Sequence, residues 1–130
     1  MKIDKTGIYI DAYNLRKLLK RAQFTMTKAD RVVYGTPLLQ ACAAFLADFV
    51  MAYDFPDERS HYIRKMCADF EVLKIDLRII VEDNVIKQTD KENAQMSPDA
   101  YKVRIFELVG RMDDGITKWR NSTKGKTATD

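Results

Sequence analysis

The feature that most constrains the fold is a long run of apolar residues at helical spacing after Pro56. Its apolar side chains recur every three or four positions: Ile63, Met66, Cys67, Phe70, Leu73, Leu77, Ile80 and Val81. This spacing lines one face of an α-helix and does not match the two-residue alternation of a β-strand. The run therefore predicts a long helix that continues to Ile86 and buries one face against other helices.

Three more segments have the helical pattern. The first covers residues 11–26, with Gly7 to Ile10 before it as either a first turn or an extended arm. The second begins at Thr36 and Pro37, a capping residue followed by the residue favoured at the first helical position, and runs to about residue 53. The last begins in the same way at Ser97 and Pro98 and ends near Arg120. Its expected apolar face is Val103, Phe106, Val109, Met112, Ile116 and Trp119.

Four amphipathic helices with short or polar connections predict an all-α fold, an antiparallel up-down four-helix bundle. Residues 87–96 are polar and aperiodic, which predicts a mobile loop. We expect one domain over residues 1–120 and a disordered basic tail over residues 121–130, which carry no large apolar side chain. An apolar content of 46% with 32% charged residues is ordinary for a globular domain.

The second segment is more apolar than one bundle can bury, since Asp48 is its only charge. Gln40 and Asp48 interrupt it, and it is shorter than the stretch of about 20 apolar residues that crosses a membrane. We therefore expect no membrane partner. Part of this helix is expected to face another copy of the chain, which predicts a homo-oligomer.

The net charge of +3 is unevenly distributed along the chain. Residues 1–31 carry eight basic against three acidic groups, residues 32–98 seven against eleven, and residues 99–130 seven against five. Basic ends attract polyanions, although they also serve as solvated faces that keep a protein soluble. The basic flank of the first helix consists of Arg16, Lys17, Lys20 and Arg21.

Lys74 and Arg78 form a second basic pair, because a spacing of four places both on one helix face. The alternative is a salt-bridged surface in which they pair with nearby acids of the same helix: Glu71, Asp76 and Glu82.

The sequence shows no pattern typical of an enzyme. No glycine-rich phosphate loop is present, and His61 is the only histidine, so a catalytic relay or a histidine-rich metal set cannot be assembled. Glu58 and His61 match the Glu-x-x-His motif of di-iron bundles, but those sites need two copies and further glutamates. We therefore expect no catalytic residues, no cofactor and no metal. Cys42 and Cys67 are expected to be free buried thiols, and the start lacks a secretion signal, which predicts a cytoplasmic protein.

Several segments together resemble one known family. They are the apolar residues 38–53, the stretch FEVLKIDLRII at residues 70–80, Met96 with Ser97 and Pro98, and the closing ELVGRMDDGITKW at residues 107–119. They are similar to the four-helix-bundle family of the accessory variability determinant (Avd) proteins of diversity-generating retroelements. The same family includes proteins encoded in intervening sequences of ribosomal RNA genes. Asp113 and Asp114 depart from its pattern by placing acid near the end.

This resemblance implies a barrel-like homopentamer without catalytic activity that binds the reverse transcriptase of the element and its template RNA, and possibly DNA. Lys74 and Arg78 match basic positions that Avd proteins use for those contacts, and the basic flank of the first helix would assist. Two alternatives stay open: an intervening-sequence protein of unknown role, and a helical assembly module with no nucleic-acid partner.

Overall fold

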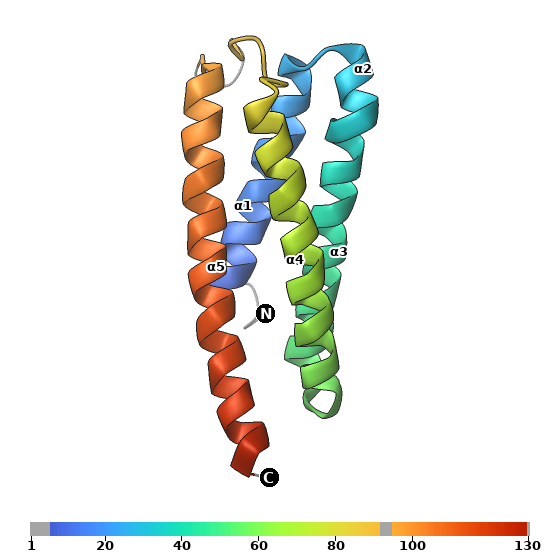
Figure 1. The fold of residues 1–130 in the computed structure, drawn as a ribbon, viewed down its shortest axis with the longest axis vertical. Coiled ribbons are helices and arrows are strands. Elements are labelled where there is room, and N and C mark those ends of the chain that lie inside the picture. Colours follow the sequence, from blue (N-terminus) through green and yellow to red (C-terminus); the bar gives the residue numbers. More distant parts are fainter. Residues whose placement is uncertain (1–5, 92–94, 130) are drawn as a thin grey trace.

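The computed structural model describes residues 6–91 and 95–129, with the side chains of residues 6–91 and 95–122. Four long helices dominate it: α1 (Gly7–Ala22), α3 (Thr36–Asp54), α4 (Arg59–Glu82) and α5 (Pro98–Thr129). Successive long helices run in opposite directions along one common axis (Figure 1). Both α1 and α4 pack against α3 and α5, so the four helices form a closed square. The predicted all-α four-helix bundle is confirmed, and the described residues hold no strand, only an isolated bridge between Asp90 and Met96.

The core is a single cluster built by all four helices. Phe45 of α3 and Phe70 of α4 meet at its centre with ring centroids 5.7 Å apart, and Phe49 meets Trp119 of α5 edge-on at 5.2 Å. Leu15 of α1 is fully buried beside them. Apolar burial at this scale is the main favourable term in folding, and it fixes how each helix is rotated about its axis.

The rotation of α5 differs from the prediction. Val103 and Phe106, expected in the core, are 57% and 58% exposed. The buried stripe of α5 is Tyr101, Ile105, Leu108, Met112 and Ile116. Two apolar stripes share this helix at equally good helical spacing, so periodicity alone could not choose between them.

Both of the first two predicted helices begin earlier than expected. Thr6 caps α1 by accepting a hydrogen bond from the Tyr9 amide, so Gly7 to Ile10 form its first turn. Ahead of α3, Thr27 caps the short α2 (Lys28–Asp30), and the π-helical turn η3 (Arg31–Gly35) joins it to α3. A proline inside a helix lacks an amide donor and crowds the preceding turn. The wider π turn just before Pro37 accommodates that ring, so the helix does not have to begin there.

The chain from Lys28 to Asp54 is thus one continuous helix, longer than the sequence predicted. By length and composition alone it could cross a membrane, a test that core helices of soluble bundles also pass. Its inward side chains, such as Leu38 and Phe45, are buried in this bundle, and Ala43, Ala44 and Ala47 make up much of its outer face.

The third predicted helix ends at Glu82 and not at Ile86. Asn84 takes a left-handed conformation with φ 52°, and the Val85 amide donates to the Ile80 carbonyl, which together form a Schellman-type stop. Val85 and Ile86 then turn inward and are buried at this end of the bundle.

The last helix starts as predicted and ends later. The Ser97 hydroxyl caps α5 by accepting from the Ala100 amide. The helix continues through Arg120 to Thr129, because a polar sequence can extend a helix that is already nucleated. The predicted disorder of the basic tail falls largely on residues 123–130, whose side chains lie outside the described part of the chain.

Candidate nucleic-acid interface

The outward face of α1 carries basic side chains between two aromatic ones. Tyr13, Lys17, Lys20 and Phe24 are spaced by four, three and four residues, which places them in one row along the helix and its last 3₁₀ turn, η2 (Gln23–Thr25). All four are exposed, Tyr13 to 48% and Phe24 to 58%. Arg16 is exposed beside the row. We refer to Tyr13, Arg16, Lys17, Lys20 and Phe24 as the α1 row.

No acidic side chain of α1 lies next to this row. The only acid of the helix, Asp11, is buried and faces Arg111 of α5, with 3.5 Å between Oδ1 and Nε. The charges of the row therefore add, which makes this face locally positive despite the modest net charge of the chain.

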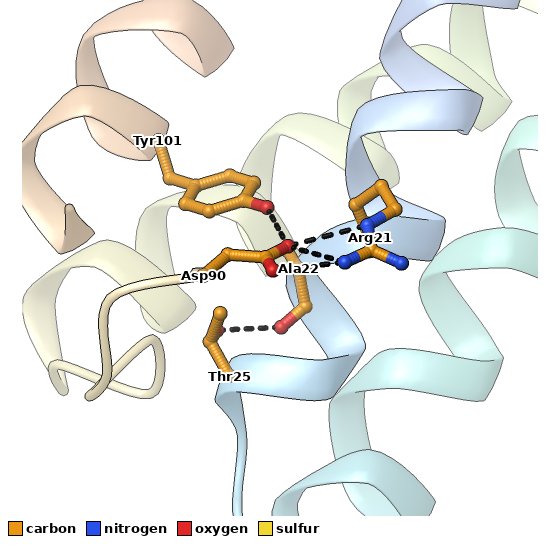
Figure 2. A network of polar contacts seen from close by, with 5 residues as sticks. All are labelled: Arg21, Ala22, Thr25, Asp90 and Tyr101. Carbon is orange, nitrogen blue, oxygen red and sulfur yellow. Dashed lines mark hydrogen bonds and ion pairs between the residues drawn. The ribbon is translucent and has the colours of Figure 1, made fainter. Parts of the chain in front are cut away.

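Arg21 is the exception among the predicted basic residues of α1. Its guanidinium forms a bidentate pair with Asp90, with Nη2 2.8 Å from Oδ1 and Nε 3.2 Å from Oδ2. Figure 2 shows the Tyr101 hydroxyl reaching the same carboxylate, to which it donates at 2.7 Å. This network joins α1, the loop before α5 and α5 itself. Asp90 is 6% exposed, so the loop that sequence patterning predicts as mobile is held at this residue, while residues 92–94 lie outside the described part.

Lys74 of α4 lies between two carboxylates. Its ammonium is 2.8 Å from Glu71 on the same helix and 3.2 Å from Asp113 of α5, and it lies 4.9 Å from the Phe70 ring centroid. Burial opposes the charged form, but the hydrogen bonds that Lys74 donates to Glu71 and Asp113 outweigh it and raise the pKa of Lys74 above its ordinary value. Its positive charge is thus largely balanced within the bundle. Sequence reasoning foresaw Glu71 as a partner and could not foresee Asp113.

Arg78 is exposed one turn further along α4, and no ion pair is found for it within the described residues. Because α1 and α4 lie across the bundle from each other, the α1 row and the pair Lys74 and Arg78 occupy separate surfaces of the bundle. The structure therefore brings Arg16, Lys17 and Lys20 together and does not bring them to Lys74 and Arg78.

A groove of about 760 Å³ separates α1 from α5 beside the α1 row. Lys17 and Leu18 line its α1 side, and Val103, Arg104 and Glu107 line its α5 side. Its wall carries both signs of charge, so it offers a less uniform surface to a polyanion than the row does.

A buried aspartate of α3, Asp48, pairs with the half-buried Asp69 of α4. Asp48 is 4% exposed, and its Oδ2 has no hydrogen-bond donor among the described residues. Burial, followed by the hydrogen bond and negative charge of Asp69, raises the pKa of Asp48 to about 6 against the lowering effect of Lys65, which is 3.6 Å away. Two carboxyl groups this close are favourable when they share a proton.

Neither cysteine forms a disulfide. Cys42 is buried and Cys67 half-buried, and burial raises the pKa of the Cys42 thiol to about 12 against the lowering effect of Arg16. Glu58 and His61 lie at the exposed start of α4. Among the side chains that the structure describes, no three His, Cys, Asp or Glu residues gather as metal ligands.

Comparison of the chain with protein-family models, with curated proteins and with solved structures gives no match.

Proposed function

We propose that this protein is a non-enzymatic, self-associating cytoplasmic accessory protein that binds RNA, and possibly DNA, and has a reverse transcriptase as its protein partner. This is the role that the resemblance to Avd proteins implies. The observation that supports it most strongly is the α1 row, an exposed basic face with no acidic side chain of its own helix beside it. Lysines and arginines in such a row neutralise phosphates and release their counterions, which is the main source of affinity for nucleic acid.

The separation of the two basic surfaces supports two partners. RNA is assigned to the α1 row, where no acid of the same helix opposes the charges. The reverse transcriptase is assigned to the surface around Lys74 and Arg78, where a lysine held between Glu71 and Asp113 offers a fixed and mixed charge pattern suited to a protein surface. Because these surfaces lie on opposite sides of the subunit, both partners can bind together.

Self-association is supported by large apolar side chains outside the core. Val72 and Ile75 of α4 and Val103 and Phe106 of α5 are each 56–58% exposed. Exposed apolar patches often mark surfaces covered in an assembly. We propose a homopentamer, for which light scattering should give five times 15.0 kDa, or about 75 kDa. A particle near the monomer mass at micromolar concentration would contradict this part of the proposal.

The partner assignment is tested with two matched double variants. Lys17→Gln with Lys20→Gln removes two charges from the α1 row, and Lys74→Ala with Arg78→Ala removes two from α4. A labelled RNA is titrated with each protein at several salt concentrations, and the reverse transcriptase is captured separately. Two lost phosphate contacts should flatten the slope of log affinity against log salt by about 1.4 for the α1 variant.

The α4 variant should keep its affinity for RNA and lose its binding to the reverse transcriptase. Circular dichroism and light scattering first establish that both variants keep their helix content and size. Unchanged RNA binding by the α1 variant would refute the assignment of RNA to the α1 row. Unchanged binding of both partners by both variants would favour a helical assembly module without these partners.

A further inference from the structure

The two aromatic rings at the ends of the α1 row are exposed to solvent and do not contribute to the core of the bundle. Tyr13 and Phe24 point outward on the same side as Lys17 and Lys20. Tyr13 stacks on Tyr9 with ring planes 14° apart and centroids 6.1 Å apart, so a stacked aromatic pair already stands on this face. A row of cations explains binding to any polyanion, but it does not explain aromatic rings at both of its ends.

We propose that the α1 row is a binding site for single-stranded nucleic acid, with bases stacked on Tyr13 and Phe24 and phosphates held by Lys17 and Lys20. This inference rests on the proposed function and names the form of nucleic acid that the row selects. Bases stack on aromatic side chains only where they are unpaired, and this contact tolerates any base sequence.

The distances within the row suit one nucleotide at each end. The Lys17 ammonium lies over the Tyr13 ring, 5.5 Å from its centroid, and uncovers that face when it turns to a phosphate, which brings the base of the same nucleotide within reach of the ring. From Tyr13 to Phe24 the helix rises about 16 Å, at 1.5 Å per residue. That length equals about five stacked bases at 3.4 Å each, so a short oligonucleotide spans the whole row.

Phe24 is held in position from outside the row. The Arg21 guanidinium carbon lies 4.9 Å from the Phe24 ring centroid, and Arg21 is fixed by its bidentate pair with Asp90. Figure 2 shows this pair at the end of α1, where Tyr101 also meets the carboxylate. An aromatic ring supported by a fixed cation loses little freedom when a base stacks on it, which favours binding.

The pattern of the row favours this ligand over other anionic surfaces. A membrane-binding helix gathers its apolar side chains on one continuous face, whereas here two lysines separate the two rings. A nucleic-acid duplex offers phosphates but keeps its bases stacked inside, so it would leave both rings unused.

The experiment compares a labelled 15-nucleotide oligouridine with a blunt 15-base-pair RNA duplex by fluorescence anisotropy at fixed salt. Tyr13→Leu with Phe24→Leu removes the aromatic faces and keeps the charges and the helix. Phe55→Leu is the matched control, because Phe55 is a comparably exposed phenylalanine, to 49%, at the end of α3 and outside both proposed surfaces. The double variant should bind oligouridine about tenfold more weakly and the duplex less than twofold more weakly, and the control should bind both as the unaltered protein does.

The other outcomes separate this inference from the proposed function. If the double variant binds oligouridine as tightly as the unaltered protein, or loses both ligands equally, stacking is refuted. The Lys17→Gln and Lys20→Gln variant then still tests the charge-based function by its salt slope. Binding of phosphatidylglycerol vesicles as tight as that of oligouridine would also overturn the single-strand site. If the unaltered protein binds neither RNA form, the proposed function fails and the inference fails with it.

Discussion

The polar network around Asp90 should contribute more to stability than any ion pair on the surface. Its carboxylate is 5% exposed and accepts from both Arg21 and the Tyr101 hydroxyl, and Tyr101 is fully buried. The perturbation is Asp90→Asn, which keeps the shape of the side chain and removes its charge. It weakens every hydrogen bond in the network at once.

The expected magnitude follows from the exposure of the partners. Removing one partner of a fully buried ion pair costs about 3–5 kcal/mol. Arg21 is 34% exposed and regains part of its hydration, so Asp90→Asn should lower the free energy of unfolding by about 2–3 kcal/mol. Tyr101→Phe removes one hydrogen bond to a charged acceptor and should cost about 1.5–3 kcal/mol. Because both changes act on one carboxylate, the double variant should cost less than their sum by about 1 kcal/mol.

The assay is urea unfolding followed by circular dichroism at one fixed protein concentration, since self-association would otherwise alter the apparent stability. In thermal unfolding each kcal/mol should lower Tm by about 4 °C for a chain of this size. Glu107→Gln is the control, because its pair with Arg104 is a surface pair on one helix, and it should cost less than about 0.5 kcal/mol. The role of the Asp90 carboxylate is refuted if Asp90→Asn lowers the free energy of unfolding no more than Glu107→Gln does. It is also refuted if the effects of Asp90→Asn and Tyr101→Phe are fully additive.

Three further predictions concern a buried carboxyl group and the packing of α5. Because the pKa of Asp48 is about 6 when folded and 3.8 in its ordinary state, its carboxyl favours folding most below pH 3.8, and this contribution is lost as the pH rises through 6. Between pH 4 and pH 7, the free energy of unfolding of Asp48→Asn should therefore rise relative to that of the unaltered protein by up to about 3 kcal/mol. Urea unfolding at each pH measures this difference, and an equal difference at both pH values would refute the pKa shift. Gly110→Ala should stabilise α5 by about 1 kcal/mol, because nothing lies near the added methyl group and alanine favours the helix. Gly115→Ala should instead destabilise the bundle, because its methyl group would lie 2.9 Å from Cγ1 of Ile8 on α1, and equal melting temperatures for the two variants would contradict this close approach.

Local sequence signals determined the number and type of elements. The spacing of apolar residues predicts four long helices, and Ser97 and Pro98 mark the start of α5 where the structure has it. Such signals act within one or two turns, so they do not depend on the rest of the chain. They failed where one local feature is compatible with two structures. Pro37 is typical of a helix start, but here it lies inside a longer helix, directly after a π turn.

The candidate interface was only half visible in the sequence. Arg16, Lys17 and Lys20 stand out by charge, whereas Tyr13 and Phe24 become part of the same row only once that face of the helix is known to point outward. The available signal was the spacing of four, three and four residues that joins Tyr13 and Phe24 to the two lysines. This spacing indicates a surface site only when both aromatic side chains are known to be exposed.

Only the tertiary structure decided which charges meet. Asp90 lies 69 residues from Arg21 along the chain, and Asp113 lies 39 residues from Lys74, so neither pair has a local signal. The packing of the core fixes the rotation of each helix, and that rotation places Tyr101 inward, Phe106 outward and Asp113 beside Lys74. Sequence periodicity defines the possible apolar faces of a helix. Packing against the side chains of the other helices decides which of these faces is buried, because burial depends on both elements in contact.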